Sequence, residues 1–136
     1  MSTNDVDYTV TIEQYAERHY VKNFEKKYNK AWAVTLKAVL EQFKRFDLLI
    51  GNFSSTEIIL TKGNYLLLKH EFRVHQTKDS AKASGNRAII FVDEVKRECQ
   101  ILLVYSKNDV FGSKETQWWQ AAIKDNYSGI WRNFHK

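Results

Sequence analysis

The stretch RAIIFVDEVKRECQILLVYSK, residues 87–107, decides the fold that we expect for this chain. It contains two largely apolar blocks, Arg87 to Val95 and Glu98 to Lys107, on either side of the turn Lys96-Arg97. Short blocks rich in Ile, Val, Phe and Tyr are typical of strands. The second block is apolar at successive positions in its centre, which indicates a central strand covered on both faces.

Two further strands are expected upstream of this pair. The segment Glu57 to Thr61 is rich in Ile and Leu, and Lys62-Gly63-Asn64 after it predicts a hairpin turn. Residues Tyr65 to Val74 alternate in polarity, which is typical of a strand whose two faces meet different surroundings. The polar stretch 75–86 separates this strand from the next one and predicts a loop.

The rest of the chain predicts one opening strand and three helices. Tyr8 to Ile12 is β-branched and aromatic, as expected of a short strand. A closing helix is expected from Lys114 to about Tyr127. Two helical stripes, broken at Asn29, lie between them: Tyr20, Phe24 and Tyr28, then Trp32, Leu36, Val39, Leu40, Phe43 and Phe46. This order predicts a two-layer α+β fold, with an N-terminal strand and helical hairpin packed on a mostly antiparallel sheet of about four strands, and a C-terminal helix.

Length and composition bound the class of protein. The chain has 136 residues, of which 43% are hydrophobic and 27% charged, as in a soluble globular protein of one domain. We expect that domain over residues 8–136, after a polar and disordered N-terminus at residues 1–7 that lacks the features of a signal peptide. No run approaches the roughly 18 apolar residues of a membrane span. The single cysteine, Cys99, allows no intramolecular disulfide, so the cytoplasm is the expected location.

The positive charge of the chain is concentrated on the strand block. A net charge of +5 suits an acidic partner such as nucleic acid. Six basic residues against two acidic ones fall between Lys62 and Val92. If the strands are neighbours, basic and aromatic side chains converge at one edge of an open sheet face: Lys69, Arg73, His75, Arg87, Tyr105 and Lys107, with Lys78 and Lys82 in the loop before Arg87.

Such a cluster has the chemistry to bind RNA. Arg and Lys bind phosphate oxygens, and Tyr offers a ring on which a base stacks. The cluster also suits metal-free cleavage, in which a base takes the proton of the attacking 2′-hydroxyl and cations stabilise the phosphorane. Glu71 and His75 are the candidate bases, and no metal-ligand spacing joins Cys99 to the histidines. The alternative is a solvated strand face, on which Lys and Arg keep the sheet soluble.

Three segments of the strand block resemble the RelE/ParE toxin superfamily: Phe72-Arg73-Val74, Gly85 to Phe91 (GNRAIIF) and Ile101 to Lys107 (ILLVYSK). The resemblance implies the toxin of a type II toxin–antitoxin system, an endoribonuclease that cuts messenger RNA on the ribosome without a metal or other cofactor. It also implies a cognate antitoxin as partner and no membrane association.

The resemblance assigns roles to individual residues. Arg87 takes the place of the family's strand-opening arginine, a ligand of the phosphate and the transition state. Lys69 and Arg73 fall where the preceding strand presents basic residues, and Lys107 falls at the end of the last core strand. The candidate surfaces for the antitoxin are the basic face, the Tyr20, Phe24 and Tyr28 stripe, and the Trp118-Trp119 pair.

Two departures from the family pattern keep other functions open. Glu71 stands where lysine is common, and Asn86 stands where tyrosine is usual. One alternative is a ParE-like protein that poisons DNA gyrase and cleaves no RNA. The other is a non-catalytic module of the same fold that binds nucleic acid or a partner protein.

Overall fold

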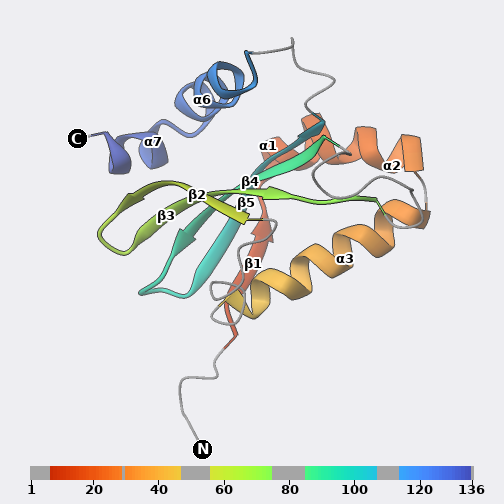
Figure 1. Ribbon diagram of the computed structural model, residues 1–136, viewed down its shortest axis with the longest axis horizontal. Coiled ribbons are helices and arrows are strands. Elements are labelled where there is room, and N and C mark those ends of the chain that lie inside the picture. The colour runs from red at the N-terminus through yellow and green to blue at the C-terminus, as the bar shows by residue number, and fades with distance from the viewer. Residues whose placement is uncertain (1–6, 29, 47–55, 75–84, 107–113, 136) are drawn as a thin grey trace, which may run out of the picture.

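The structure is a computed structural model that describes residues 7–28, 30–46, 56–74, 85–106 and 114–135, without the side chains of His19, Tyr20 and Asn23 (Figure 1). Its strands are β1 (Thr9–Ile12), β2 (Thr56–Lys62), β3 (Tyr65–Glu71), β4 (Asn86–Asp93) and β5 (Glu98–Ser106). Its helices are α1 (Gln14–Ala16), the π-helical turn η1 (Glu17–Val21), α2 (Lys22–Tyr28), α3 (Lys30–Lys44), α6 (Glu115–Asn126) and α7 (Ser128–Phe134).

The strands form one five-stranded sheet in the order β1-β5-β4-β3-β2. β1 runs parallel to β5, and every other neighbouring pair is antiparallel. The predicted mostly antiparallel sheet is thus confirmed, with the N-terminal strand at one edge. The β2–β3 hairpin turns through Gly63, whose φ of 59° is accessible to glycine at little cost.

The turn between β4 and β5 is built around a buried carboxylate. Asp93 accepts hydrogen bonds from the backbone N–H groups of Val95 and Lys96, both at 3.0 Å. It also accepts one at 2.9 Å from the side-chain amide of Asn64 in the neighbouring hairpin. An aspartate that bonds the backbone just after it stabilises a turn, so the charged segment after β4 reverses the chain as the sequence predicts.

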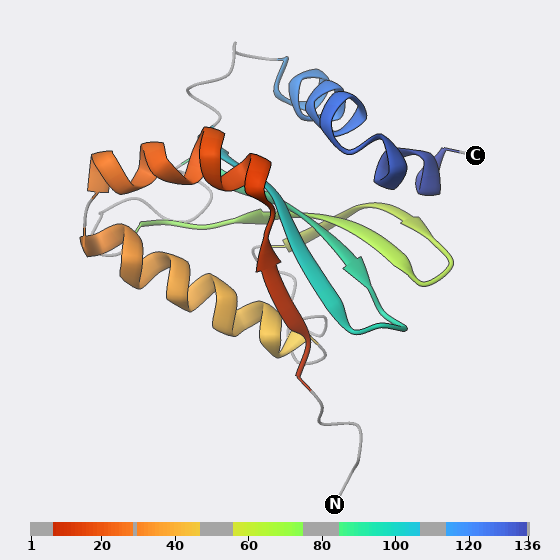
Figure 2. The same cartoon turned by 180° about the vertical axis from the view of Figure 1, so that it is seen from behind.

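Helices cover both faces of the sheet (Figures 1 and 2). The hairpin of α1, η1, α2 and α3 lies on one face, and α6 and α7 lie on the other. The α+β fold class is confirmed, and the C-terminal helices form a layer of their own. Burial of every residue of β4 fits this arrangement, because a strand covered on both faces is apolar at odd and even positions alike.

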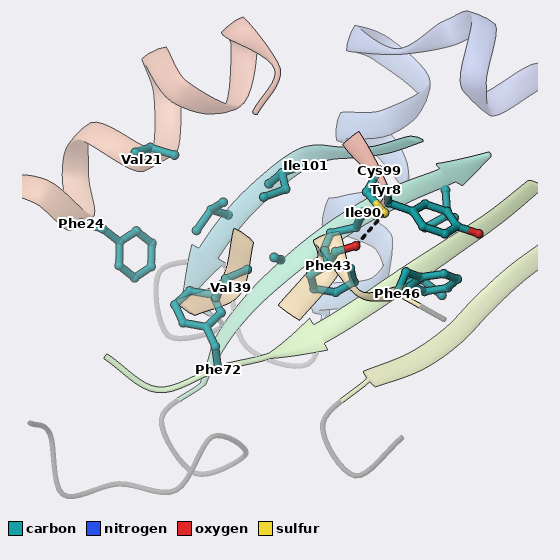
Figure 3. Packing of buried hydrophobic residues seen from close by; sticks show 14 of the residues in the cluster. Tyr8, Val21, Phe24, Val39, Phe43, Phe46, Phe72, Ile90, Cys99 and Ile101 are labelled. Carbon is teal, nitrogen blue, oxygen red and sulfur yellow. Dashed lines mark hydrogen bonds between the residues drawn. The ribbon is translucent and has the colours of Figure 1, made fainter. Parts of the chain in front are cut away.

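The larger core lies between the sheet and the N-terminal helices (Figure 3). Phe24 of α2 stacks on Trp32 of α3 with ring centroids 4.7 Å apart, and both rings contact Phe72 at 5.9 Å. Phe43 packs edge-on against the buried ring of His70 at 5.1 Å. The expected packing of the helical hairpin on the sheet is therefore confirmed for Phe24 and for the second stripe, whereas the side chain of Tyr20 lies outside the described set.

A second core joins the C-terminal helices to the other face of the sheet. Trp119 and Ile123 of α6 are buried against Leu67, Ile89 and Leu103. Their spacing of four residues places both on one face of the helix. Each such side chain contributes about 1.5–3 kcal/mol when fully buried, so these contacts fix α6 on the sheet. The helix ends at Asn126, and Tyr127 separates it from α7. The Tyr127 hydroxyl donates a hydrogen bond of 2.9 Å to the carbonyl oxygen of Leu102 on β5.

Candidate functional site

Three neighbouring strands place three polar residues in a row. Glu71 of β3 pairs with Arg87 of β4, and Arg87 pairs with Tyr105 of β5. Directly paired residues point to the same face of a sheet, and here that face is the one under α6, because Tyr105 belongs to the second core. The row lies at the start of β4, directly after the segment that the sequence predicts as a loop of the RNA site.

Arg87 lies buried between two carboxylates. Its Nη2 atom is 3.1 Å from Oε2 of Glu71, and its Nε atom is 3.7 Å from Oε2 of Glu115, the first residue of α6. Its Nη1 atom donates a hydrogen bond of 3.3 Å to the carbonyl oxygen of Asn86. The residue is 4% exposed. Among the described residues, the buried Nε atom has no acceptor within hydrogen-bond range, so one donor of the guanidinium is poorly used.

Tyr105 joins the same cluster from β5. Its hydroxyl donates a short hydrogen bond of 2.6 Å to Oε2 of Glu115, and its ring lies 4.8 Å from that of Trp118. Burial of the phenol, the hydrogen bond to Glu115 and the charge of that carboxylate raise the pKa of Tyr105, against the opposing effect of Arg87. Tyr105 is therefore a proton donor fixed in its neutral form.

The predicted open, basic sheet face is wrong. Arg87 and Tyr105 are buried under α6, and two carboxylates outnumber the one guanidinium between them. The cause is the apolar surface that Leu67, Ile89 and Leu103 form on this face, which would lie exposed without the C-terminal helix. Tyr105 consequently offers no exposed ring for a nucleobase in this arrangement.

Of the remaining predicted site residues, two belong to the described part of the chain and four do not. Lys69 lies on the same strand face two residues before Glu71, and its Nζ atom is 3.6 Å from Oε1 of Glu57 on β2. Arg73 lies past the end of β3 and is exposed. His75, Lys78, Lys82 and Lys107 lie outside the described residues, so their convergence on Arg87 stays a prediction.

Glu115 is the member of the cluster that sequence reasoning missed. The signal was an acidic residue in the first turn of a predicted helix, a position that favours acids on any helix because of the helix dipole. Only the packing of α6 on the sheet brings this carboxylate to Arg87. Of the Trp118-Trp119 pair, Trp119 is buried and Trp118 is partly exposed, as two adjacent helical positions require.

Two buried titratable residues lie apart from this cluster, on the face under the N-terminal helices. His70 Nδ1 is 2.9 Å from the hydroxyl of Thr56, and burial lowers the pKa of the imidazole to about 4. Cys99 is fully buried with its Sγ atom 3.8 Å from the carbonyl oxygen of Phe43, and burial raises the pKa of the thiol to about 12. A thiol with such a pKa stays protonated, so Cys99 is a core residue and not a nucleophile.

A groove of about 1030 Å³ is lined by residues of the N-terminal helices, which pack on the face of the sheet opposite α6. Its apolar lining includes Tyr28, Trp32 and Leu36, and its charged lining consists of Glu17, Glu25 and Lys30. Tyr28, one member of the predicted docking stripe, is half-buried and lines this groove. No described helix is long and apolar enough to cross a membrane, and no described group of His, Cys, Asp and Glu side chains could hold a metal ion.

The class that these features define is an α+β protein with a five-stranded sheet between two helical layers and a Glu-Arg-Glu-Tyr cluster in which the arginine and the tyrosine are buried. No protein-family model matches the sequence, and no curated protein matches it. The fold is similar to a chain in the crystal structure of the archaeal RelE-RelB complex from Pyrococcus horikoshii. The TM-score is 0.52 at 13% sequence identity, over 76% of this chain and 99% of that chain. The RelE-like fold that the strand segments predicted is thereby confirmed.

Proposed function

We propose that this chain is the toxin of a type II toxin–antitoxin system and a metal-independent endoribonuclease that cleaves messenger RNA on the ribosome. The observation that carries the proposal is the fold likeness to a chain of a RelE-RelB complex, which spans nearly all of that chain. The Glu71–Arg87 pair at the opening of β4 adds chemistry, since it places a carboxylate 3.1 Å from a guanidinium.

The pair supplies the two groups that RNA cleavage needs. Glu71 accepts the proton of the 2′-hydroxyl while the 2′-oxygen forms a bond to phosphorus, and the bond from phosphorus to the 5′-oxygen breaks. Arg87 stabilises the charge that develops on the phosphate oxygens, and a water or an acidic side chain returns a proton to the 5′-oxygen. His75 is the predicted alternative base.

The proposal includes a cognate antitoxin as partner. It is supported by the similar chain, which was solved in a RelE-RelB complex. The groove of Tyr28, Trp32 and Leu36 offers an apolar surface of the kind that a partner helix covers. Co-expression with the reading frame next to its gene and co-purification of both products test this part of the proposal.

Induced expression in a bacterial host, with primer extension on a reporter messenger RNA, tests the cleavage. The informative variant is Glu71→Gln, which keeps the shape of the side chain and slows the reaction about a hundredfold or more if Glu71 is the base. Glu94→Gln, an exposed residue in the β4–β5 turn, removes the same charge elsewhere and is the matched control. Growth arrest with discrete cuts that Glu71→Gln abolishes and Glu94→Gln retains would support the proposal.

A second candidate is the non-catalytic binding module. The observation that favours it is the charge of the cluster, because both sides of Arg87 are already neutralised by carboxylates. Folded protein that causes no arrest and leaves the reporter intact would favour this candidate. Arrest without cuts would instead point to the ParE-like alternative, which inhibition of gyrase in a supercoiling assay identifies.

A further inference from the structure

The guanidinium of Arg87 presents one edge to two different carboxylates. The Nε and Nη2 atoms form the edge with which arginine binds a single carboxylate or phosphate through two parallel hydrogen bonds. Here Glu71 contacts Nη2 at 3.1 Å, while Glu115 lies 3.7 Å from Nε. The buried Nε donor is left without a hydrogen bond to any described residue. The edge is thus occupied, but it is not filled as one well-placed oxyanion would fill it.

A single oxygen atom of Glu115 marks where such an oxyanion would lie. Oε2 of Glu115 accepts the hydroxyl hydrogen of Tyr105 at 2.6 Å and is also the atom that lies 3.7 Å from Nε of Arg87. Two donors from neighbouring strands therefore converge on one acceptor oxygen that comes from a different layer of the fold. A phosphate oxygen that lay closer to Nε, still within reach of the Tyr105 hydroxyl, would receive both donors.

The two carboxylates come from different layers of the fold. Glu71 is on a strand directly opposite Arg87 in the sheet, and its contact is the shorter one. Glu115 is the first residue of α6, and the residues that anchor the helix, Trp119 and Ile123, lie at least one turn further along. Rotation of the Glu115 side chain away from Arg87 breaks the hydrogen bond of 2.6 Å from Tyr105 but leaves the buried contacts of α6 in place.

We propose that Glu115 is an internal stand-in for phosphate, which occupies the Arg87–Tyr105 anion site and yields it to a phosphate group of the ligand. This inference rests on the proposed function, since it assigns the access control of that same site. With Glu115 in place the cluster has two negative charges and one positive charge, which repel an incoming phosphate. Once Glu115 leaves, Arg87 and Tyr105 together offer donors to the phosphate oxygens.

The test uses inorganic phosphate and the full chain, so that it does not depend on RNA cleavage. Glu115→Gln removes the charge and keeps an acceptor for Tyr105, and Glu115→Ala empties the space. We expect both variants to bind phosphate about tenfold more tightly than wild type. The binding is followed by titration of the Nε–H signal of Arg87 in ¹H–¹⁵N spectra. Glu94→Gln, which changes the net charge equally at a distant turn, should bind as weakly as wild type.

The outcomes separate this inference from the proposed function. Tighter phosphate binding with a shifted Arg87 signal in both Glu115 variants supports the stand-in role even if no RNA is cut. Binding in both Glu115 variants that equals that of Glu94→Gln overturns it, because a stand-in must lower the affinity that its removal restores. RNA cleavage by wild type together with that second result would leave the proposed function intact and refute only the role of Glu115.

Discussion

The burial of Arg87 predicts that its removal destabilises the whole fold. Arg87→Met keeps an unbranched apolar stem and removes the guanidinium with its charge, which leaves Glu71 and Glu115 without their counter-ion. Breaking a buried ion pair in this way costs about 3–5 kcal/mol. The two carboxylates each retain 19% side-chain exposure, so water screens part of their repulsion, and we expect a loss of about 2–3 kcal/mol.

Urea denaturation followed by circular dichroism and tryptophan fluorescence measures this loss. For a domain of this size, it corresponds to a fall of about 1.5 M in the urea midpoint and about 8 °C in the melting temperature. The triple variant Arg87→Met, Glu71→Gln, Glu115→Gln removes the whole charged cluster. It should recover stability to within about 1 kcal/mol of wild type, because a neutral, well-packed replacement leaves no unpaired charge.

Two results would refute this reasoning. If Arg87→Met unfolds at the wild-type midpoint, the guanidinium does not hold the two carboxylates as a buried cluster. If the triple variant is as unstable as the single variant, the loss comes from packing and not from unpaired charge. The exposed residue Arg73 supplies the control. Arg73→Met should change the free energy of unfolding by no more than about 0.5 kcal/mol.

Two further predictions concern the buried groups under the N-terminal helices. Because burial lowers the pKa of His70 from 6.5 to about 4, the unfolded chain binds an extra proton between these values. The free energy of unfolding should therefore fall by up to about 3 kcal/mol as the pH drops through this window. Thermal melts at pH 4.5 and pH 7 measure this fall, and His70→Gln should reduce it. An equal fall in His70→Gln would assign the effect to other groups. The raised pKa of Cys99 predicts that a thiol reagent at pH 8 modifies the native chain only after unfolding, and rapid labelling in native buffer would contradict its burial.

The sheet could be predicted from the sequence because local patterns specify it. Alternation over Tyr65 to Val74 and the apolar blocks around residues 87–107 are strand signals, and Gly63 marks a hairpin. The row of Glu71, Arg87 and Tyr105 follows from these strands once they are neighbours in register. Local pattern therefore predicted the strands, and the row needed the further assumption that they are neighbours.

The C-terminal layer could be predicted only in part, since its position depends on contacts distant in sequence. A helix near residues 114–127 was expected, but α7 was not, because Tyr127, Ser128 and Gly129 are weak helix formers and indicate an end. The direction in which α6 packs is set by Trp119 and Ile123 against the sheet. The approach of Glu115 to Arg87 follows from that packing and from no local signal.

The parallel pairing of β1 with β5 has a consequence for synthesis of the chain. Thr9 lies beside Glu98, so β1 is synthesised well before β5, the strand that it pairs with in the described sheet. Contacts between such distant segments form late and slowly. Until β5 has left the ribosomal exit tunnel, β1 has an unpaired backbone and the helical hairpin lacks the sheet face that it covers. The nascent chain therefore stays without its complete sheet, and without the Arg87 cluster, until β5 and Glu115 of α6 have left the tunnel.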